Sequence, residues 1–256
     1  MLIFRKLATA VIFATGIFFS APIYGADFEL VGRELARMLQ NGHYARLAFN
    51  EDLSRRFLER YLDSLDGSKI YFLEREVTEM KRRYERVLHD RISTKSIMPV
   101  ANNIHEIYRG RVMARVAYVK DLLASKEFTF EEKRVVIDDR SEVAWPVDDL
   151  ELRKIWSDNL ENLLLSETVR RARLKARAIE GGKPDPFRRK PSIKKTVDLK
   201  FDRLLKSIEE IEQEDIANYF FSAVTKAYDP HSEYFSSNEM AQFKIDVSNE
   251  LVGIGA

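Results

Sequence analysis

The sequence predicts an all-α protein: a multi-helix domain with a signal peptide at its start and a short unpaired strand at its C-terminal end. Three observations lead to this fold class. The 256 residues include only 10 glycines and 7 prolines, so long stretches carry no turn signal. Apolar side chains recur every three or four residues, which is the period of an amphipathic helix. The composition, 45% apolar and 32% charged, is ample for a packed core and too charged for a membrane bundle.

The first segment has the order of residues found in a secretory signal. Arg5 and Lys6 precede an uncharged apolar run over 7–19, and small or turn-forming residues follow at positions 20–22, 25 and 26. The run is shorter than the about 20 residues that span a bilayer, and an uncleaved anchor is the alternative. No cysteine follows the run, so lipid attachment to a cysteine is excluded. We predict that residues 1–25 are a cleaved signal peptide and that the protein is exported to the periplasm.

The charge of the remaining chain bears on its partners. Removal of residues 1–25 leaves 40 basic and 41 acidic residues, a net charge of −1. A net charge so close to zero argues against a dedicated nucleic-acid-binding protein, and export argues against it as well. We therefore expect proteins as partners, and no nucleic acid.

Three helices are predicted in the first third of the chain from apolar stripes that end at turn residues. The first stripe covers residues 30–39 and ends at Asn41-Gly42, and the second covers 57–65 and ends at Asp66-Gly67. The third covers 73–88. Their apolar members are Leu30, Val31, Leu35, Met38 and Leu39; Phe57, Leu58, Tyr61, Leu62 and Leu65; and Leu73, Val77, Met80, Tyr84, Val87 and Leu88.

Two longer helices are predicted in the middle of the chain. One carries an apolar stripe over residues 104–123, and the other is expected from Leu150 to about Ala178. The segment 128–146 between them is less regular. Because it has three aromatics and the run Val135-Val136-Ile137, we read it as a candidate for a short extended stretch.

A break follows, because two glycines and two prolines in residues 181–186 cannot continue a helix. Helices are expected to resume over 197–211 and 215–228, and Ser236 with Glu239 forms a capping-box pattern that predicts a last short helix. The predicted organisation is a helical domain whose first part is 26–180 and whose closing segment is 196–250. A basic Gly/Pro linker, 181–195, joins the two.

The charge is concentrated in one segment. Residues 168–195 contain eleven Lys or Arg and two acids, a net charge of +9, so the rest of the exported chain carries −10. A solvated helix face and linker is the simpler interpretation. The alternative is a contact between this segment and a membrane surface of anionic lipid, or an acidic partner surface.

The sequence offers no catalytic, cofactor-binding or metal-binding residues that we can assign. The four histidines, at 43, 89, 105 and 231, have no partner at a recognised metal-ligand spacing. The absence of cysteine excludes disulfides, thiolate sites and Cys nucleophiles. Asp229, His231 and Ser232 include the residue types of a hydrolytic triad, but neighbours on one turn cannot easily place a hydroxyl and a carboxylate on opposite nitrogens of one imidazole. We expect them to make local hydrogen bonds to backbone groups freed at the helix end.

Several motifs nevertheless resemble one family. Residues 227–235, Ala-Tyr-Asp-Pro-His-Ser-Glu-Tyr-Phe, resemble the Asp-Pro-His-Ser/Thr-x-Tyr element that C-terminal processing proteases carry just ahead of their PDZ domain. Residues 251–256, Leu-Val-Gly-Ile-Gly-Ala, resemble the strand that opens that PDZ module. His43-Tyr44, residues 61–66 and residues 69–73 resemble the helical N-terminal region of the tail-specific branch. The resemblance extends over nearly all of the chain after the signal.

The resemblance implies a function that the chain alone does not carry. Members of this family are exported serine endopeptidases that recognise apolar C-terminal tails through the PDZ domain and cleave with a Ser–Lys dyad. No position here matches the dyad or its nucleophile segment. We therefore expect the non-catalytic N-terminal scaffold of such a protease, truncated where the PDZ domain begins and inactive by itself. Unfolded or C-terminally exposed substrates would bind through the remaining domains.

Two other functions stay open from the sequence. One is a stand-alone periplasmic adaptor or inhibitor that binds partners through a helical face. The other is an independent hydrolase using His231 and Ser232, which the geometry of a turn disfavours. The apolar ending over 251–256 favours the protease fragment, since a self-contained module should end on a helix or a polar tail.

Overall fold

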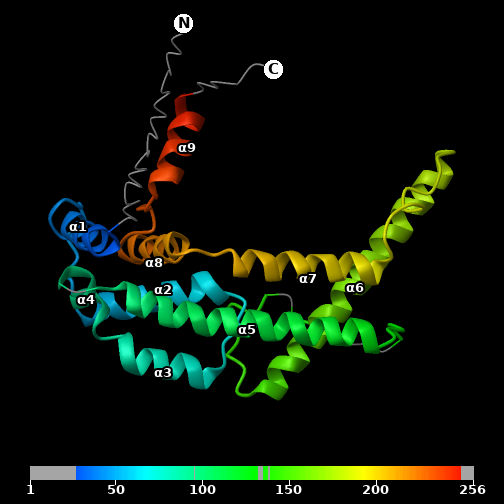
Figure 1. Ribbon diagram of the computed structural model, residues 1–256, viewed down its shortest axis with the longest axis horizontal. Helices are drawn as coiled ribbons and strands as arrows, with labels where there is room; N and C mark the ends of the chain where they lie inside the picture. The colour runs from blue at the N-terminus through cyan, green and yellow to red at the C-terminus, as the bar shows by residue number, and fades with distance from the viewer. Residues whose placement is uncertain (1–26, 95, 132–134, 138, 249–256) are drawn as a thin grey trace, which may run out of the picture.

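The protein is an all-α molecule, as predicted. The computed structural model describes residues 27–94, 96–131, 135–137 and 139–248, and its described part contains helices and no strands (Figure 1). The predicted signal peptide, the opening strand over 251–256 and the end of the closing segment lie outside the described residues. The helices are α1 (Phe28–Asn41), α2 (Glu51–Asp66), α3 (Glu74–Tyr84), α4 (Leu88–Thr94), α5 (Met98–Ser125), α6 (Asp149–Glu180), α7 (Ile193–Glu209), α8 (Gln213–Tyr228) and α9 (Ser237–Ser248).

Polar caps define where several helices begin. A side-chain oxygen of the residue before the helix accepts a hydrogen bond from a backbone N–H of the first turn, which would otherwise lack a partner. The predicted capping box of α9 forms in this way: the Glu239 N–H donates to Ser236 Oγ at 3.3 Å, and the Ser236 N–H donates to Glu239 Oε2 at 2.8 Å. The other capping residues are Asp27 for α1, Asn50 for α2, Asp148 for α6 and Ser192 for α7.

Helix α1 buries only part of its predicted apolar stripe: Leu39 is buried, and Val31 and Leu35 pack against the core. Leu30 and Met38 are exposed, whereas Gly32 and Ala36 are buried. A Cβ atom at Gly32 would lie 3.4 Å from the Phe221 ring. The small residues therefore allow α1 to lie close against α4 and α8, and this close approach decides which face is inside.

The third predicted helix is two helices. Helix α3 ends at Tyr84, and α4 begins at Leu88 after a short turn. Ser54 of α2 explains the restart, because its buried hydroxyl oxygen accepts hydrogen bonds from the N–H groups of Leu88 at 2.7 Å and His89 at 3.3 Å. A side chain from another helix thus caps α4.

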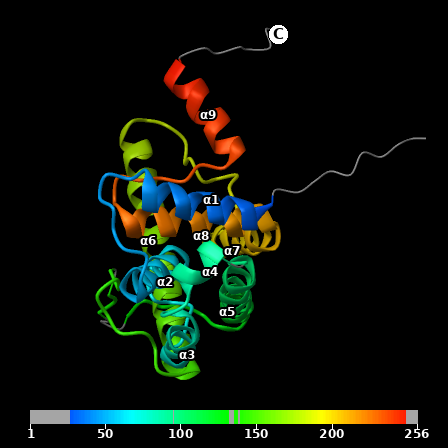
Figure 2. The same cartoon turned by 90° about the vertical axis from the view of Figure 1, so that its left-hand side faces the viewer.

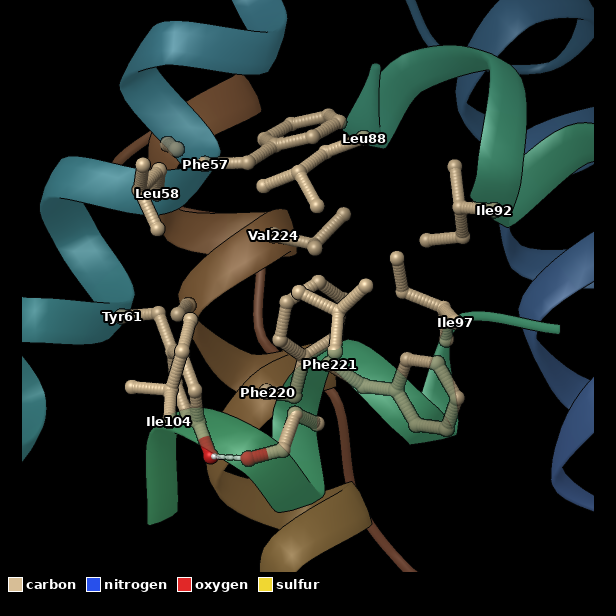
Figure 3. Packing of buried hydrophobic residues seen from close by; sticks show 14 of the residues in the cluster. Phe57, Leu58, Tyr61, Leu88, Ile92, Ile97, Ile104, Phe220, Phe221 and Val224 are labelled. Carbon is tan, nitrogen blue, oxygen red and sulfur yellow. Dashed lines mark hydrogen bonds between the residues drawn. The ribbon is translucent and has the colours of Figure 1, made fainter. Parts of the chain in front are cut away.

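The larger of the main hydrophobic clusters is built around the pair α2 and α8. Phe57 and Tyr61 of α2 face Phe220 and Val224 of α8, with α4 and α5 closing the sides (Figure 3). The Tyr61 ring meets the Phe220 ring edge-on at 5.1 Å, and its hydroxyl donates to the Ala101 carbonyl at 3.1 Å. This cluster fixes α8 against the N-terminal helices, as the view along the molecule also shows (Figure 2).

The other main cluster lies along the second half of α5, where α6 and α7 cover it. Its buried members are Val112, Val116, Val119, Leu123, Leu160, Leu164, Val197, Phe201 and Ile208. The described residues of 128–146 form neither helix nor strand. Beyond this cluster, the end of α6 and the whole of α9 project from the packed helices (Figure 1).

Candidate functional site

The fold brings together two motifs that lie far apart in the sequence. His43 and Tyr44 are in the loop between α1 and α2, and Asp229 to Ser232 form the turn that ends α8. Tyr228, the last residue of α8, is buried and joins the two, since its hydroxyl donates to the Leu39 carbonyl at 2.8 Å. The His43 ring packs edge-on against the Tyr228 ring, with centroids 5.0 Å apart. We call the cluster of His43, Tyr44, Asp229 and Ser232 the exit tie, because the chain leaves the packed helices here on its way to α9.

Asp229 is the centre of the exit tie. Its Oδ1 accepts a hydrogen bond from the Tyr44 hydroxyl at 3.0 Å. Its Oδ2 accepts from Ser232 Oγ at 3.0 Å and from the His231 backbone N–H at 3.2 Å. Burial favours the neutral acid, but these hydrogen bonds outweigh it and hold the pKa of the Asp229 carboxyl below its ordinary value. The hydrogen bond to Asp229 in turn raises the pKa of the Tyr44 hydroxyl.

The cluster contains Ser, His and Asp, but its hydrogen bonds run in the wrong direction for a hydrolytic triad. The Ala45 N–H donates to His43 Nδ1 at 3.1 Å, so the hydrogen of the neutral ring is on Nε2. Nε2 lies 3.1 Å from Ser232 Oγ and therefore donates to it, while Ser232 donates onward to Asp229. A general base must accept the proton of the serine hydroxyl. His43 cannot do so in this arrangement, so we interpret the cluster as a structural tie.

The histidine of the motif has a different place from the one expected. The turn is held by the His231 backbone N–H and the Ser232 hydroxyl, which both donate to the Asp229 carboxylate, while the His231 side chain is exposed. The imidazole that reaches Ser232 belongs to His43, which is 189 positions away. Sequence reasoning marked His43-Tyr44 and Asp229 to Ser232 as separate motifs. Only the contact between the α1–α2 loop and the end of α8 shows that they form one cluster.

The remaining motif, over 61–73, has a structural role of the same kind. Asp66 ends α2 and is buried, and its carboxylate accepts from the N–H groups of Ile70 at 2.8 Å, Tyr71 at 2.8 Å and Phe72 at 2.9 Å. Burial raises the pKa of Asp66, although these three hydrogen bonds act in the opposite direction. The loop that Asp66 folds is held to α6, because Trp156 Nε1 donates to the Ile70 carbonyl at 2.6 Å.

An open groove of about 640 Å³ lies beside the exit tie, between α2, α8 and the start of α9. Its walls mix both charges, with Arg60 and Lys226 beside Asp63 and Glu239. Lys226 is paired with Glu233 at 3.2 Å. Within the described residues, no three His, Cys, Asp or Glu side chains gather as a metal site, and no described helix is long and apolar enough to cross a membrane.

Comparison with known proteins agrees with this arrangement of motifs. A family model described as the tail-specific protease N-terminal domain matches residues 35–238. The chain is also similar to the tail-specific protease of Haemophilus influenzae, with 21% identity over 236 residues. That match covers 92% of this chain and 31% of the relative, so the chain spans about a third of the length of the curated relative that it matches.

Proposed function

The chain belongs to the family of tail-specific protease N-terminal domains, and on that premise we propose that it is the non-catalytic helical scaffold of a periplasmic tail-specific serine endopeptidase. In this proposal the scaffold holds the segment after α8 in a fixed place relative to the packed helices. The peptidase activity, which would cleave proteins at or near their C-termini, would reside in domains other than this one.

The observation that carries the proposal is the exit tie. Asp229 accepts hydrogen bonds from Tyr44, Ser232 and the His231 amide, so the loop after α1 and the turn after α8 are held at one carboxylate. These bonds fix the conformation of the turn through which the chain leaves α8. A scaffold needs such a fixed exit if it is to place a neighbouring domain.

The domain organisation proposed for the chain agrees with this role. Residues 26–180 and 196–250 would form one helical domain, with the basic segment 181–195 between its parts. Residues 1–25 would direct export, given their charged, apolar and small-residue order. Residues 251–256, with the sequence Leu-Val-Gly-Ile-Gly-Ala, would begin the PDZ module.

Peptidase activity of the isolated chain tests the non-catalytic part of the proposal. The chain is incubated with an unfolded protein that has an apolar C-terminus, and the products are weighed by mass spectrometry. We expect no cleavage, because the His43 ring donates to Ser232 instead of accepting its proton. Cleavage that disappears in the Ser232→Ala variant would show that the exit tie is a catalytic centre.

A further inference from the structure

The second half of α6 extends beyond the body of the protein. The last buried side chain of the helix is Glu167, and from residue 172 to Glu180 every residue except the half-buried Ala178 is exposed. The chain turns at Gly182, whose φ of 65° is the left-handed conformation that glycine adopts readily, and returns to α7. Figure 1 shows this hairpin projecting past α7. We call residues 165–192 the distal arm; the predicted basic linker forms its tip and return.

Several contacts keep the distal arm in shape without a core of its own. Glu167 pairs with Arg170 and Arg171, each at 2.7 Å, and Arg171 also donates to the Pro191 carbonyl at 2.7 Å. The Arg171 guanidinium lies over the Phe187 ring, with its Cζ atom 4.9 Å from the ring centroid. Because these contacts join the outgoing helix to the returning chain near the base, the surface farther out is left open.

That open surface is amphipathic. At 100° per residue, five positions of α6 fall on one side of the helix; they are Leu165, Val169, Ala172, Ala176 and Ile179. The large members of this stripe are exposed to 41% at Leu165, 39% at Val169 and 60% at Ile179. Arg173 and Arg177 follow one edge of the stripe, and Lys175 lies along the other.

Most cations of the distal arm lack an acidic partner. Lys175 is paired with Asp185 at 3.0 Å. Six other cations of the arm have no carboxylate oxygen within 4.0 Å among the described residues: Arg173, Arg177, Lys183, Arg188, Arg189 and Lys190. A projecting structure whose exposed apolar stripe has unpaired arginines along one edge and a lysine along the other is suited to an anionic partner that also accepts apolar side chains.

We propose that the distal arm docks the protein on an anionic lipid surface. The apolar stripe enters the boundary between headgroups and acyl chains, and the flanking Arg and Lys side chains contact lipid phosphates. A lipid surface fits better than an acidic protein, because the stripe is long, shallow and cationic along both edges. The alternative is a second copy of this chain, whose remaining exported residues carry −10.

Vesicle binding by three proteins tests this proposal. They are the full chain, the arm variant R173Q/R177Q/R188Q, and a matched variant R56Q/R60Q/K200Q that removes three exposed cations elsewhere. All three share residues 1–26, so any binding through the apolar N-terminal run is equal among them. On vesicles of phosphatidylglycerol mixed with phosphatidylcholine, we expect the arm variant to bind about a hundredfold more weakly. The matched variant should bind nearly as well as the unchanged chain.

A charge-neutral variant and a second measurement complete the test. Ile179→Asn should weaken binding to the same vesicles while its circular dichroism stays unchanged, because Ile179 is exposed and supports no core. Equal losses of vesicle binding in the arm and matched variants would overturn the proposal. So would binding of the arm variant to pure phosphatidylcholine vesicles that is as strong as its binding to the mixed vesicles. So would concentration-dependent self-association, seen by sedimentation without vesicles and abolished by the arm substitutions, since the partner would then be a second copy.

Discussion

At the scale of single residues, two aspartates account for the motifs that stand out in the sequence. Asp66 folds the loop after α2 by accepting three backbone N–H groups. Asp229 joins the loop after α1 to the turn after α8. A carboxylate suits both places, because one side chain can accept several hydrogen bonds at once. Both carboxylates hold backbone segments in place, and we assign neither aspartate a catalytic role.

The Asp229→Asn variant should show how much of the exit tie depends on charge. A carboxyl whose pKa is lowered on folding adds stability above its ordinary value of 3.8 and loses it as the pH falls through the folded value. Asparagine does not titrate, and it cannot accept equally from Tyr44 and Ser232. We expect the variant to melt lower at neutral pH, with a gap that narrows as the pH drops below 3.8. A gap that stayed constant in calorimetry over this range would contradict the assigned ionisation.

Asp66→Ala should destabilise the protein strongly. The substitution leaves the N–H groups of Ile70, Tyr71 and Phe72 without their acceptor, and an unsatisfied buried group costs about 1–3 kcal/mol. With partial access of water to the freed groups, we expect a loss of about 3 kcal/mol in the free energy of unfolding, measured with urea. Asp63→Ala is the matched control, since Asp63 lies in the same motif but is exposed. Similar losses in the two variants would mean that the loop does not depend on Asp66.

At the scale of helices, the sequence predicted most elements and missed those that depend on distant contacts. Apolar periodicity located α2, α5, α6 and α8, because each buries a stripe of apolar residues, which in α6 ends at Leu164. It could not separate α4 from α3, since the cap of α4 is Ser54 on another helix. It also assigned Leu30 and Met38 to the core, because the close approach at Gly32 has no signal in local hydrophobicity. The exit tie was missed for the same reason.

Ser54→Ala tests whether a distant side chain sets the start of α4. The hydroxyl oxygen accepts from the N–H groups of Leu88 and His89, and both would lose that acceptor. Loss of a helix cap typically costs about 1 kcal/mol, and burial should bring the loss here to about 2 kcal/mol. Hydrogen exchange should quicken at Leu88 and His89 more than in α2 itself. Unchanged exchange at these two amides would show that α4 begins without the Ser54 cap.

At the scale of the whole molecule, the α2–α8 core and the exit tie hold the N-terminal helices and α8 together as one packed unit. Two structures project from the packed helices at separate places: α9 leaves beside the exit tie, and the distal arm extends beyond the cluster of α5, α6 and α7 (Figure 1). Binding of the distal arm to a lipid surface would therefore leave the exit tie uncovered. We infer a helical scaffold that sets the direction of the chain beyond α8.

The most direct test of this role is a chimera with the relative from Haemophilus influenzae. This chain replaces the matched region, which is 31% of that protease, and cleavage of an unfolded protein with an apolar C-terminus is measured. We predict that the chimera cleaves, that Asp63→Ala leaves its rate unchanged, and that Asp229→Ala lowers the rate at least tenfold while the helical circular dichroism persists. Full activity of a folded Asp229→Ala chimera would contradict the claim that the exit tie positions the chain beyond α8.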